Sequence, residues 1–543
     1  MYLTLKDTRM TERVMRSAIV LLMFVFIAGC GAVEQTATEP PLRRIVYGLT
    51  LQPSGIDPHI NASSELGIPL RQVYDTLIYR DPETREFTAG LASTWSIAED
   101  QLTYTFTLRQ GVVFHDGTPF TAQAVATTLD RITNPDNGSQ RALFMLGPYE
   151  GYTVIDDFTI QIQLSEPYSP LLDSLSQVYL GIASPKALAE YSRDRYQFHQ
   201  VGTGPFRFVE YIPGDRIVLR RNTDYRWGPV FYSDSDGIDE IEFRFYTDAA
   251  TRSLALSNGE VQVMGEIPPL DARTLTNNSA IQLKQTPIPG QPLQFLINTQ
   301  RFPTDNLAIR QALLYATNRD AIIDSIFQRF SSVAWGPLSA NTLYFNRQLV
   351  GTYEQNSAQA QTLLASAGYT DSNNDGILDI GGLDLEVTII VPPWGSVPEV
   401  AQLLQDQWRT IGVRVRLDPV PTFNALRERV ESGEYNLVAY YTFGLDPVLL
   451  NQFFLTGGIT NWSRYSNSEL DRLLTEATRQ VEPAVRSSLY AQAQQIIMDA
   501  ALLLPIRDYV NINGAISGLR EFNFDAYGWF PILNGMSVGA AGT

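Results

Sequence analysis

The sequence predicts an α/β fold of more than one domain. Residues 104–108 and 160–164 alternate polar and apolar side chains, a pattern typical of half-buried strands. Apolar residues recur at helical spacing in residues 309–316 and 400–411, and we expect the second helix to stop at Gly412. A chain of 543 residues is longer than one hydrophobic core usually supports. Strands mixed with helices over this length therefore indicate α/β lobes.

Helix and turn signals add local detail. Residues 468–471 have the pattern of a capping box, and apolar side chains follow it at helical spacing. The Asp116-Gly117 pair predicts a tight turn before a helix capped near Thr121. His115 stands beside this turn, so we expect it to stabilise local structure through hydrogen bonds rather than to catalyse a reaction.

Composition excludes several functions. The formal net charge of −18 disfavours nucleic acid and anionic lipid as partners. Cys30 is the only cysteine, so the rest of the chain has no disulfide and no nucleophilic thiol. The three histidines lie far apart and match no metal motif, and no Gly-x-Ser-x-Gly elbow is present. We therefore do not expect an enzyme.

The amino terminus predicts a lipoprotein signal peptide. Residues 18–27 form an unbroken apolar run behind basic side chains, and the run is too short to span a bilayer comfortably. Residues 27–30 (IAGC) resemble the bacterial lipobox. This resemblance implies that residues 1–29 are removed and that Cys30 is the site of lipid attachment. A buried amino-terminal helix with an incidental cysteine is the alternative.

Residues 30–41 are polar and end in two prolines, which is typical of a flexible tether. We expect an extracytoplasmic protein held at the cell membrane through its lipid alone, because two or three acyl chains anchor a protein far better than one.

Eight further segments occur in the order typical of one family. They are residues 55–59 (GIDPH), 91–95 (LASTW), 102–109 (LTYTFTLR), 111–122 (GVVFHDGTPFTA), 202–206 (GTGPF), 221–225 (RNTDY), 309–313 (IRQAL) and 465–474 (YSNSELDRLL). Together they resemble the peptide/nickel-type family of ABC-importer solute-binding proteins, family 5, of structural class C. The resemblance covers nearly the whole chain after residue 41.

The resemblance implies a two-lobed periplasmic-binding-protein type II fold. The first lobe would hold residues 42–288 and 511–543, with an extra subdomain at about 76–200. The second lobe would hold residues 289–510. Ligand would bind between the lobes, which would close upon it about two crossover segments.

The resemblance also implies ligand contacts in four short segments. They are Asn61, Ser63, Ser64, Pro393, Trp394, Phe423, Tyr440, Tyr441, Thr442 and Phe443. Aromatic side chains offer large, rigid contact areas, which suits a ligand pocket. For each aromatic residue the alternative is a place in the hydrophobic core.

The last of these segments departs from the family pattern. Peptide-binding members carry an acidic residue there that pairs with the amino group of the peptide. Residues 440–447 (YYTFGLDP) are about two residues shorter, and the expected position holds no acid. Asp446 matches a turn-forming acid before proline, and it would anchor an amine only if the loop folds differently. A buried ammonium without a partner is costly, so an oligosaccharide stays open beside a peptide.

A candidate metal loop lies between residues 371 and 382. Asp371, Asn373 and Asp375 alternate before a glycine, and Asp379 follows, as in the first half of a calcium loop. Gly382 stands where an EF-hand needs glutamate. The segment is either a calcium site or a solvated turn, and no other cofactor is expected.

These observations predict a monomeric solute-binding protein. It would capture a peptide or another small molecule and deliver it to the permease of an ABC importer. A sensor that presents the same ligand to a receptor is the alternative, because a fold does not by itself determine a function.

Overall fold

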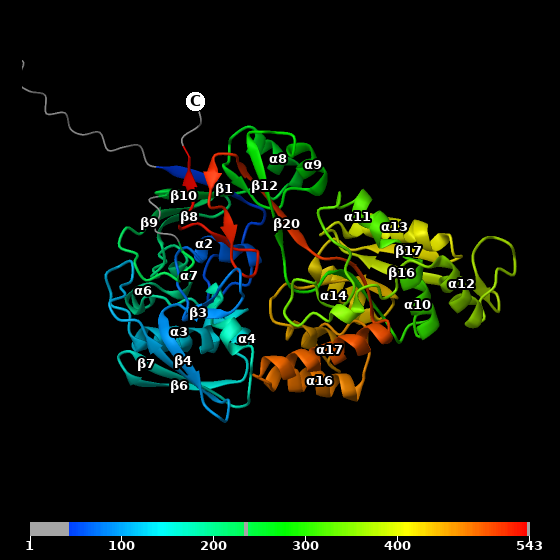
Figure 1. Ribbon diagram of the computed structural model, residues 1–543, viewed down its shortest axis with the longest axis horizontal. Coiled ribbons are helices and arrows are strands. Elements are labelled where there is room, and N and C mark those ends of the chain that lie inside the picture. Colours follow the sequence, from blue (N-terminus) through cyan, green and yellow to red (C-terminus); the bar gives the residue numbers. More distant parts are fainter. Residues whose placement is uncertain (1–42, 233–236, 540–543) are drawn as a thin grey trace, which may run out of the picture. The chain divides into compact units, whose positions relative to one another are not determined.

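Two large sheets organise the part of the chain that the computed structural model describes, residues 43–232 and 237–539 (Figure 1). The first sheet has the strand order β12-β20-β11-β1-β10-β9-β8. Its strands are β1 (Arg44–Leu49), β8 (Phe206–Ile212), β9 (Arg216–Arg221), β10 (Glu240–Phe245), β11 (Val263–Met264), β12 (Ile281–Pro287) and β20 (Val510–Ile516). β1 runs parallel to β10 and β11, and the other neighbours are antiparallel.

The second sheet has the order β17-β16-β18-β13-β19. Its strands are β13 (Leu293–Ile297), β16 (Glu386–Val391), β17 (Arg414–Pro419), β18 (Leu437–Ala439) and β19 (Leu503–Arg507). All residues of β13 and β19 are buried, as expected of a central strand and of an edge strand that other elements cover.

A third sheet of four antiparallel strands has the order β4-β5-β7-β6. Its strands are β4 (Ala92–Ile97), β5 (Thr103–Leu108), β6 (Tyr149–Asp156) and β7 (Thr159–Leu164). Burial alternates along β5 and β7, which confirms both strands predicted from sequence alternation. The third sheet lies within the range predicted for the extra subdomain.

The chain passes between the two large sheets twice. It leaves the first sheet after β12 and enters the second at β13, and it returns between β19 and β20. Residues 288–292 and 508–509 are therefore the two crossover segments.

Helices flank the sheets. Those between β1 and β13 are α2 (Gly67–Leu70), α3 (Ala122–Thr133), α4 (Ala142–Met145), α5 (Leu171–Ser174), α6 (Pro185–Glu190), α7 (Arg193–Tyr196), α8 (Ala249–Ser257) and α9 (Pro269–Leu275). Those between β13 and β19 are α10 (Leu307–Ala316), α11 (Arg319–Ser325), α12 (Ser357–Ser366), α13 (Val397–Arg409), α14 (Phe423–Ser432), α15 (Leu449–Phe454), α16 (Ser468–Arg479) and α17 (Pro483–Asp499).

Short elements complete the described chain. The short strands are β2 (Ile78–Arg80), β3 (Phe87–Ala89), β14 (Asp379–Ile380), β15 (Leu383–Asp384), β21 (Leu519–Arg520), β22 (Asn523–Phe524), β23 (Pro531–Ile532) and β24 (Ser537–Val538). The single-turn helices are η1 (Ser64–Leu66), η2 (Pro135–Asn137), η3 (Val178–Leu180) and η4 (Arg347–Leu349).

Buried apolar side chains form two large cores that follow this division. The first core contains residues from 45–288 and 515–536 and also Leu445. The second core contains residues from 293–506. Two α/β lobes with separate cores confirm the predicted fold class. Within the described residues, no helix combines the length and apolar character needed to cross a membrane. The predicted signal peptide, the tether and Cys30 lie outside the described residues.

The predicted helix signals are confirmed with two corrections. The apolar stripe of 309–316 lies on α10, whereas that of 400–411 runs past α13, which ends at Arg409 before Ile411 and before the predicted stop at Gly412 (φ +82°). The capping-box prediction at 468–471 was wrong by one residue. Asn467, not Ser468, is the N-cap of α16, because its side-chain oxygen accepts the Leu470 N–H.

Candidate functional site

A cavity of about 410 Å³ is lined by residues of both lobes. The first lobe contributes side chains between residues 141 and 179 and, from the returning chain, Tyr527, Trp529 and Phe530. The second lobe contributes residues 442–452, and the crossover contributes Ile288 and Pro289. A cavity of this size with a mainly apolar wall is typical of small-molecule sites.

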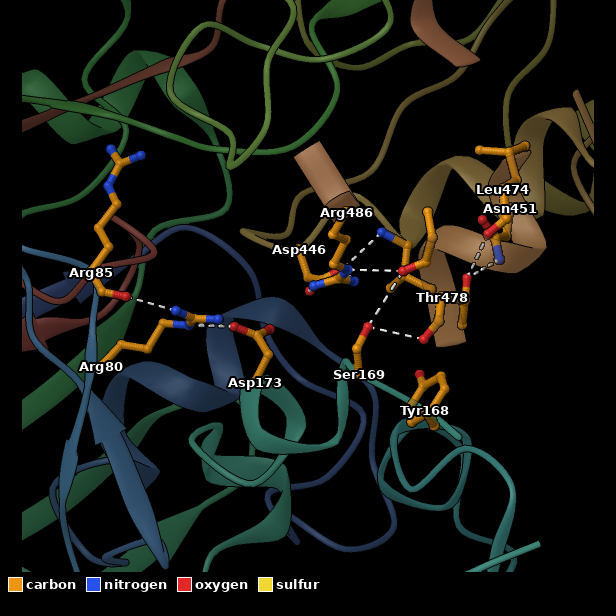
Figure 2. Close-up of polar contacts among 12 residues, drawn as sticks. Arg80, Arg85, Tyr168, Ser169, Asp173, Asp446, Asn451, Leu474, Thr478 and Arg486 are labelled. Carbon is orange, nitrogen blue, oxygen red and sulfur yellow. Dashed lines mark hydrogen bonds and ion pairs between the residues drawn. The ribbon is translucent and has the colours of Figure 1, made fainter. Parts of the chain in front are cut away.

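Two buried Arg–Asp pairs hold acidic side chains at this cavity, one pair in each lobe (Figure 2). Arg80 Nε lies 2.6 Å from Asp173 Oδ1 in the first lobe. Arg486 binds Asp446 through two parallel bonds of 2.7 Å in the second lobe. All four side chains are at most 7% exposed. Each carboxylate of the cavity wall is thus neutralised by an arginine of its own lobe.

The Asp446 pair is strongly coupled. Burial lowers the pKa of Arg486, but attraction to Asp446 outweighs burial and raises that pKa above its ordinary value. Asp446 Oδ1 also accepts the Val448 N–H at 2.9 Å, which is the turn-forming role expected of an acid before proline. Both carboxylate oxygens of Asp446 are therefore engaged inside the protein, and Asp446 is not a free anchor for an amine.

Three aromatic rings connect the cavity to the crossover. Phe443 stacks on Trp529 with ring centroids 5.5 Å apart and contacts Tyr509 at 4.8 Å. Phe443 and Trp529 line the cavity, whereas Tyr509 lies in the second crossover segment. The ring cluster joins both lobes at the point where the chain passes between them.

The lobes also meet away from the crossovers. The N–H and the hydroxyl of Ser169 both donate to the carbonyl oxygen of Thr478, each at 2.9 Å (Figure 2). Arg479 Nη2 pairs with Glu166 Oε2 at 2.5 Å on the surface nearby. Ser169 lies between Tyr168 and Pro170, both in the cavity wall. These contacts hold the wall of the first lobe against α16 of the second.

The structure brings only some of the predicted contact residues to this cavity. Thr442, Phe443 and Asp446 line it. Tyr440 packs instead against Phe423, Phe453 and Trp462, with centroid distances of 4.7–5.7 Å, although Phe423 is still 42% exposed.

The remaining predicted contacts lie outside the cavity lining. Trp394 is half-buried, Pro393 is exposed, and burial raises the pKa of Tyr441 to about 12. Asn61 accepts the Asp57 N–H, and the Ser63 carbonyl accepts the hydroxyl of Tyr179, itself a lining residue. The side chain of Ser64 is outside the described residues. A ligand role for these residues stays a prediction.

Sequence reasoning missed most of the cavity wall. No sequence motif includes Arg80, Asp173 or Arg486. The Arg80–Asp173 pair joins residues 93 positions apart in the sequence, and the Arg486–Asp446 pair joins residues 40 positions apart. The aromatic run of residues 527–530 (YGWF) was the one available signal, since such clusters are enriched in binding sites.

The candidate metal loop is a hydrogen-bonded turn. Asp371 accepts the N–H groups of Asp375 and Gly376, and Asp375 accepts that of Ile377. Asp379 accepts the N–H groups of Ser372 and Gly382. No group of three or more His, Cys, Asp or Glu side chains suited to a metal ion occurs in residues 43–232 and 237–539. Calcium binding at Asp371, Asn373, Asp375 and Asp379 stays a prediction.

A buried glutamate, Glu65, and a partly exposed one, Glu266, lie beside the second crossover. The Thr50 hydroxyl stands 3.1 Å from Glu65 Oε1 and 2.9 Å from Glu266 Oε2, and the Tyr509 hydroxyl donates to Glu266 at 3.0 Å. Burial and repulsion from Glu266 raise the pKa of Glu65 to about 7.

This pKa predicts a pH-dependent stability. Folded Glu65 keeps its proton up to about pH 7, whereas the unfolded chain releases it near 4.5. The free energy of unfolding should therefore fall, relative to Glu65→Gln, by about 3 kcal/mol as the pH rises through this window. Urea unfolding at pH 4.5, 6 and 8 measures the difference between the two proteins. An equal difference at all three pH values would contradict the assignment.

An α/β fold with two cores and a cavity shared by both lobes is typical of binding proteins for small solutes. Residues 86–462 match the family described as bacterial extracellular solute-binding proteins, family 5 Middle, and the chain belongs to this family. The predicted resemblance is thereby confirmed.

Curated relatives extend over most of the chain. The glutathione-binding protein GsiB of Salmonella paratyphi A is 28% identical over 501 residues, which cover 89% of this chain and 92% of that protein. GsiB of Pectobacterium atrosepticum is 31% identical over 424 residues, with coverage of 75% and 77%.

Solved structures show the same fold. NikA from Brucella suis in complex with Fe(III)-EDTA superposes with a TM-score of 0.81 at 20% identity, covering 91% of this chain and 99% of that one. DppA from Helicobacter pylori in complex with the peptide STSA has a TM-score of 0.73 at 23% identity, covering 92% and 98%. These similarities confirm the two-lobed periplasmic-binding-protein fold.

Proposed function

We propose that this protein captures a small ligand, a peptide or another small polar solute, between its two lobes and delivers it to an ABC importer. The observation that carries the proposal is the cavity of about 410 Å³ to which both lobes and one crossover contribute. Family membership supports it, as do relatives named as glutathione-binding proteins and a similar fold solved with a peptide.

Each proposed lobe is built around one of the two large sheets. The proposal keeps the lobe bounds predicted from the sequence, residues 42–288 with 511–543 and residues 289–510, and in it ligand binding brings the two cores together about the crossovers. The ligand favours the closed arrangement because it contacts both walls only there. The Ser169–Thr478 contact adds to closure from outside the cavity.

Ligand capture is tested with the full mature chain. Native mass spectrometry of the purified protein should show a small molecule released on unfolding, and calorimetry should show saturable binding of that molecule. Substituting a bulky side chain at Ser174 in the cavity wall (Ser174→Trp) should abolish binding, whereas Ser488→Trp on α17 should not. Equal binding by both variants would place the ligand elsewhere.

The lipid anchor at Cys30 is part of the same proposal. It is supported by the apolar run, the small residues before the cysteine and the absence of any other cysteine. Replacing Cys30 with alanine should move the protein from the membrane fraction to the soluble extracytoplasmic fraction, because the lipid is the only attachment. Metabolic labelling with a fatty acid, followed by fractionation, measures this. Labelling of the variant would refute the anchor.

A further inference from the structure

The charged side chains of the cavity wall differ in whether an oppositely charged side chain of the protein neutralises them. Three of them line the cavity, namely Arg141, Asp173 and Asp446. The two acids are engaged by Arg80 and Arg486 respectively. The guanidinium of Arg141 makes no hydrogen bond or ion pair with any described residue, and it lies over the ring of Tyr179, whose centroid is 4.2 Å from Arg141 Cζ.

This arrangement leaves one positive charge in the cavity unbalanced. A guanidinium over an aromatic face keeps the N–H groups at its edge available, and their planar fork matches a carboxylate with two parallel bonds. The backbone of Arg141 is held at the N-cap of α4, where its carbonyl oxygen accepts the Met145 N–H.

An ammonium group finds no corresponding partner. Asp446 already accepts two bonds from Arg486 and one from Val448. Asp173 accepts bonds from Arg80, from the Tyr527 hydroxyl at 2.9 Å and from Gln177 at 3.3 Å. A cation in the cavity would have to break one of these buried bonds or remain unpaired, and both are costly.

The rest of the wall suits an apolar body. Met145, Phe443, Leu449 and Trp529 line the same cavity as Arg141. Burying such a body contributes roughly 25 cal/mol per Å² of apolar surface.

We infer that the cavity takes a small carboxylate ligand whose acid group binds Arg141 and whose amino end is blocked or absent, such as an N-acylated amino acid or short peptide. This inference rests on the proposed function and names its ligand class. The acid group supplies orientation, and the apolar wall supplies most of the affinity.

Three forms of one dipeptide, which differ only in the charge of their termini, test the inference. Calorimetry compares alanyl-phenylalanine that is N-acetylated with a free carboxylate, the unmodified dipeptide, and its carboxyl-terminal amide with a free amine. The N-acetylated acid should bind most tightly and the amide least. Arg141→Gln should weaken binding of the acid by about tenfold to hundredfold, the cost of a lost charged hydrogen bond, and leave binding of the amide unchanged.

Two further variants separate charge from folding. Arg141→Lys should restore part of the affinity, because a lysine keeps the charge but loses the fork. Arg347→Gln, an exposed arginine of η4 outside the cavity wall, should bind all three compounds like the wild type. Each variant is first shown to melt like the wild type.

The outcomes distinguish this inference from the proposed function. Binding of the amide as tight as that of the acid, or an Arg141→Gln variant with unchanged affinity for the acid, would overturn the inference and leave solute binding intact. Failure of all three compounds would overturn the ligand class, while native mass spectrometry decides separately whether the chain holds any solute.

Discussion

Replacing Arg486 with methionine should lower the free energy of unfolding by about 3–5 kcal/mol, because Asp446 is then left charged and buried without its partner. Both side chains are at most 6% exposed, and both oxygens of Asp446 accept bonds from Arg486. Urea unfolding at neutral pH measures the loss. The double variant Arg486→Met with Asp446→Leu should recover most of it, since no unpaired charge remains.

A surface pair provides the matched control. Arg427 and Glu431 lie one helical turn apart on α14 and are 59% and 68% exposed. Arg427→Met should change stability by less than about 1 kcal/mol, as is usual for exposed pairs. Equal losses for Arg427→Met and Arg486→Met would show that the buried pair is not the stabilising unit described above.

The buried Arg486–Asp446 pair also allows a test between two roles for Asp446, a structural partner of Arg486 or an anchor for a ligand amine. Asp446→Asn should lower stability and should not selectively weaken binding of ligands with a free amine, because Arg486 occupies the carboxylate. Selective loss of amine-bearing ligands by a variant that is as stable as the wild type would restore Asp446 as the amine anchor that the sequence left open.

Replacing Gly290 with alanine should have the second large effect, lowering the free energy of unfolding by about 2–5 kcal/mol through backbone strain and overlap. Gly290 lies in the first crossover with a φ of +127°. A Cβ there would lie 2.6 Å from Phe443 Cα and 2.7 Å from the Thr442 carbonyl oxygen, both backbone atoms of the cavity wall.

Ligand affinity should fall together with stability in this variant, because the overlap displaces the loop that carries Phe443. Gly457→Ala is the control. Gly457 has a φ of +77°, but a Cβ there would meet no atom within 4 Å. It should cost only about 1 kcal/mol of strain and leave affinity unchanged. Chemical unfolding and calorimetry on both variants give the comparison. Similar losses in the two would attribute the effect to strain alone.

The local pattern of polar and apolar residues predicted those helices and strands in which buried side chains recur at a regular spacing along the sequence. β5 and β7 were predicted because every second side chain enters the core, and α10 because its apolar stripe recurs at helical spacing. The α16 cap was misplaced by one residue because Asn467 and Ser468 are both good capping residues, and only backbone geometry decides between them.

The candidate site was predicted in part. The family resemblance pointed to the loop of residues 440–446, and Thr442, Phe443 and Asp446 of that loop line the cavity. The resemblance could not show that Asp446 is occupied by Arg486. That pairing joins a loop to a helix 40 residues later, and no local pattern encodes which distant arginine meets which carboxylate.

By itself the sequence determined the class of this protein, its α/β character and the segment that holds its cavity loop. Only the tertiary structure decided the electrostatics of the cavity, because the charge that a ligand meets depends on which side chains are neutralised in space. Asp173 and Asp446 are balanced by their own arginines, and Arg141 is not.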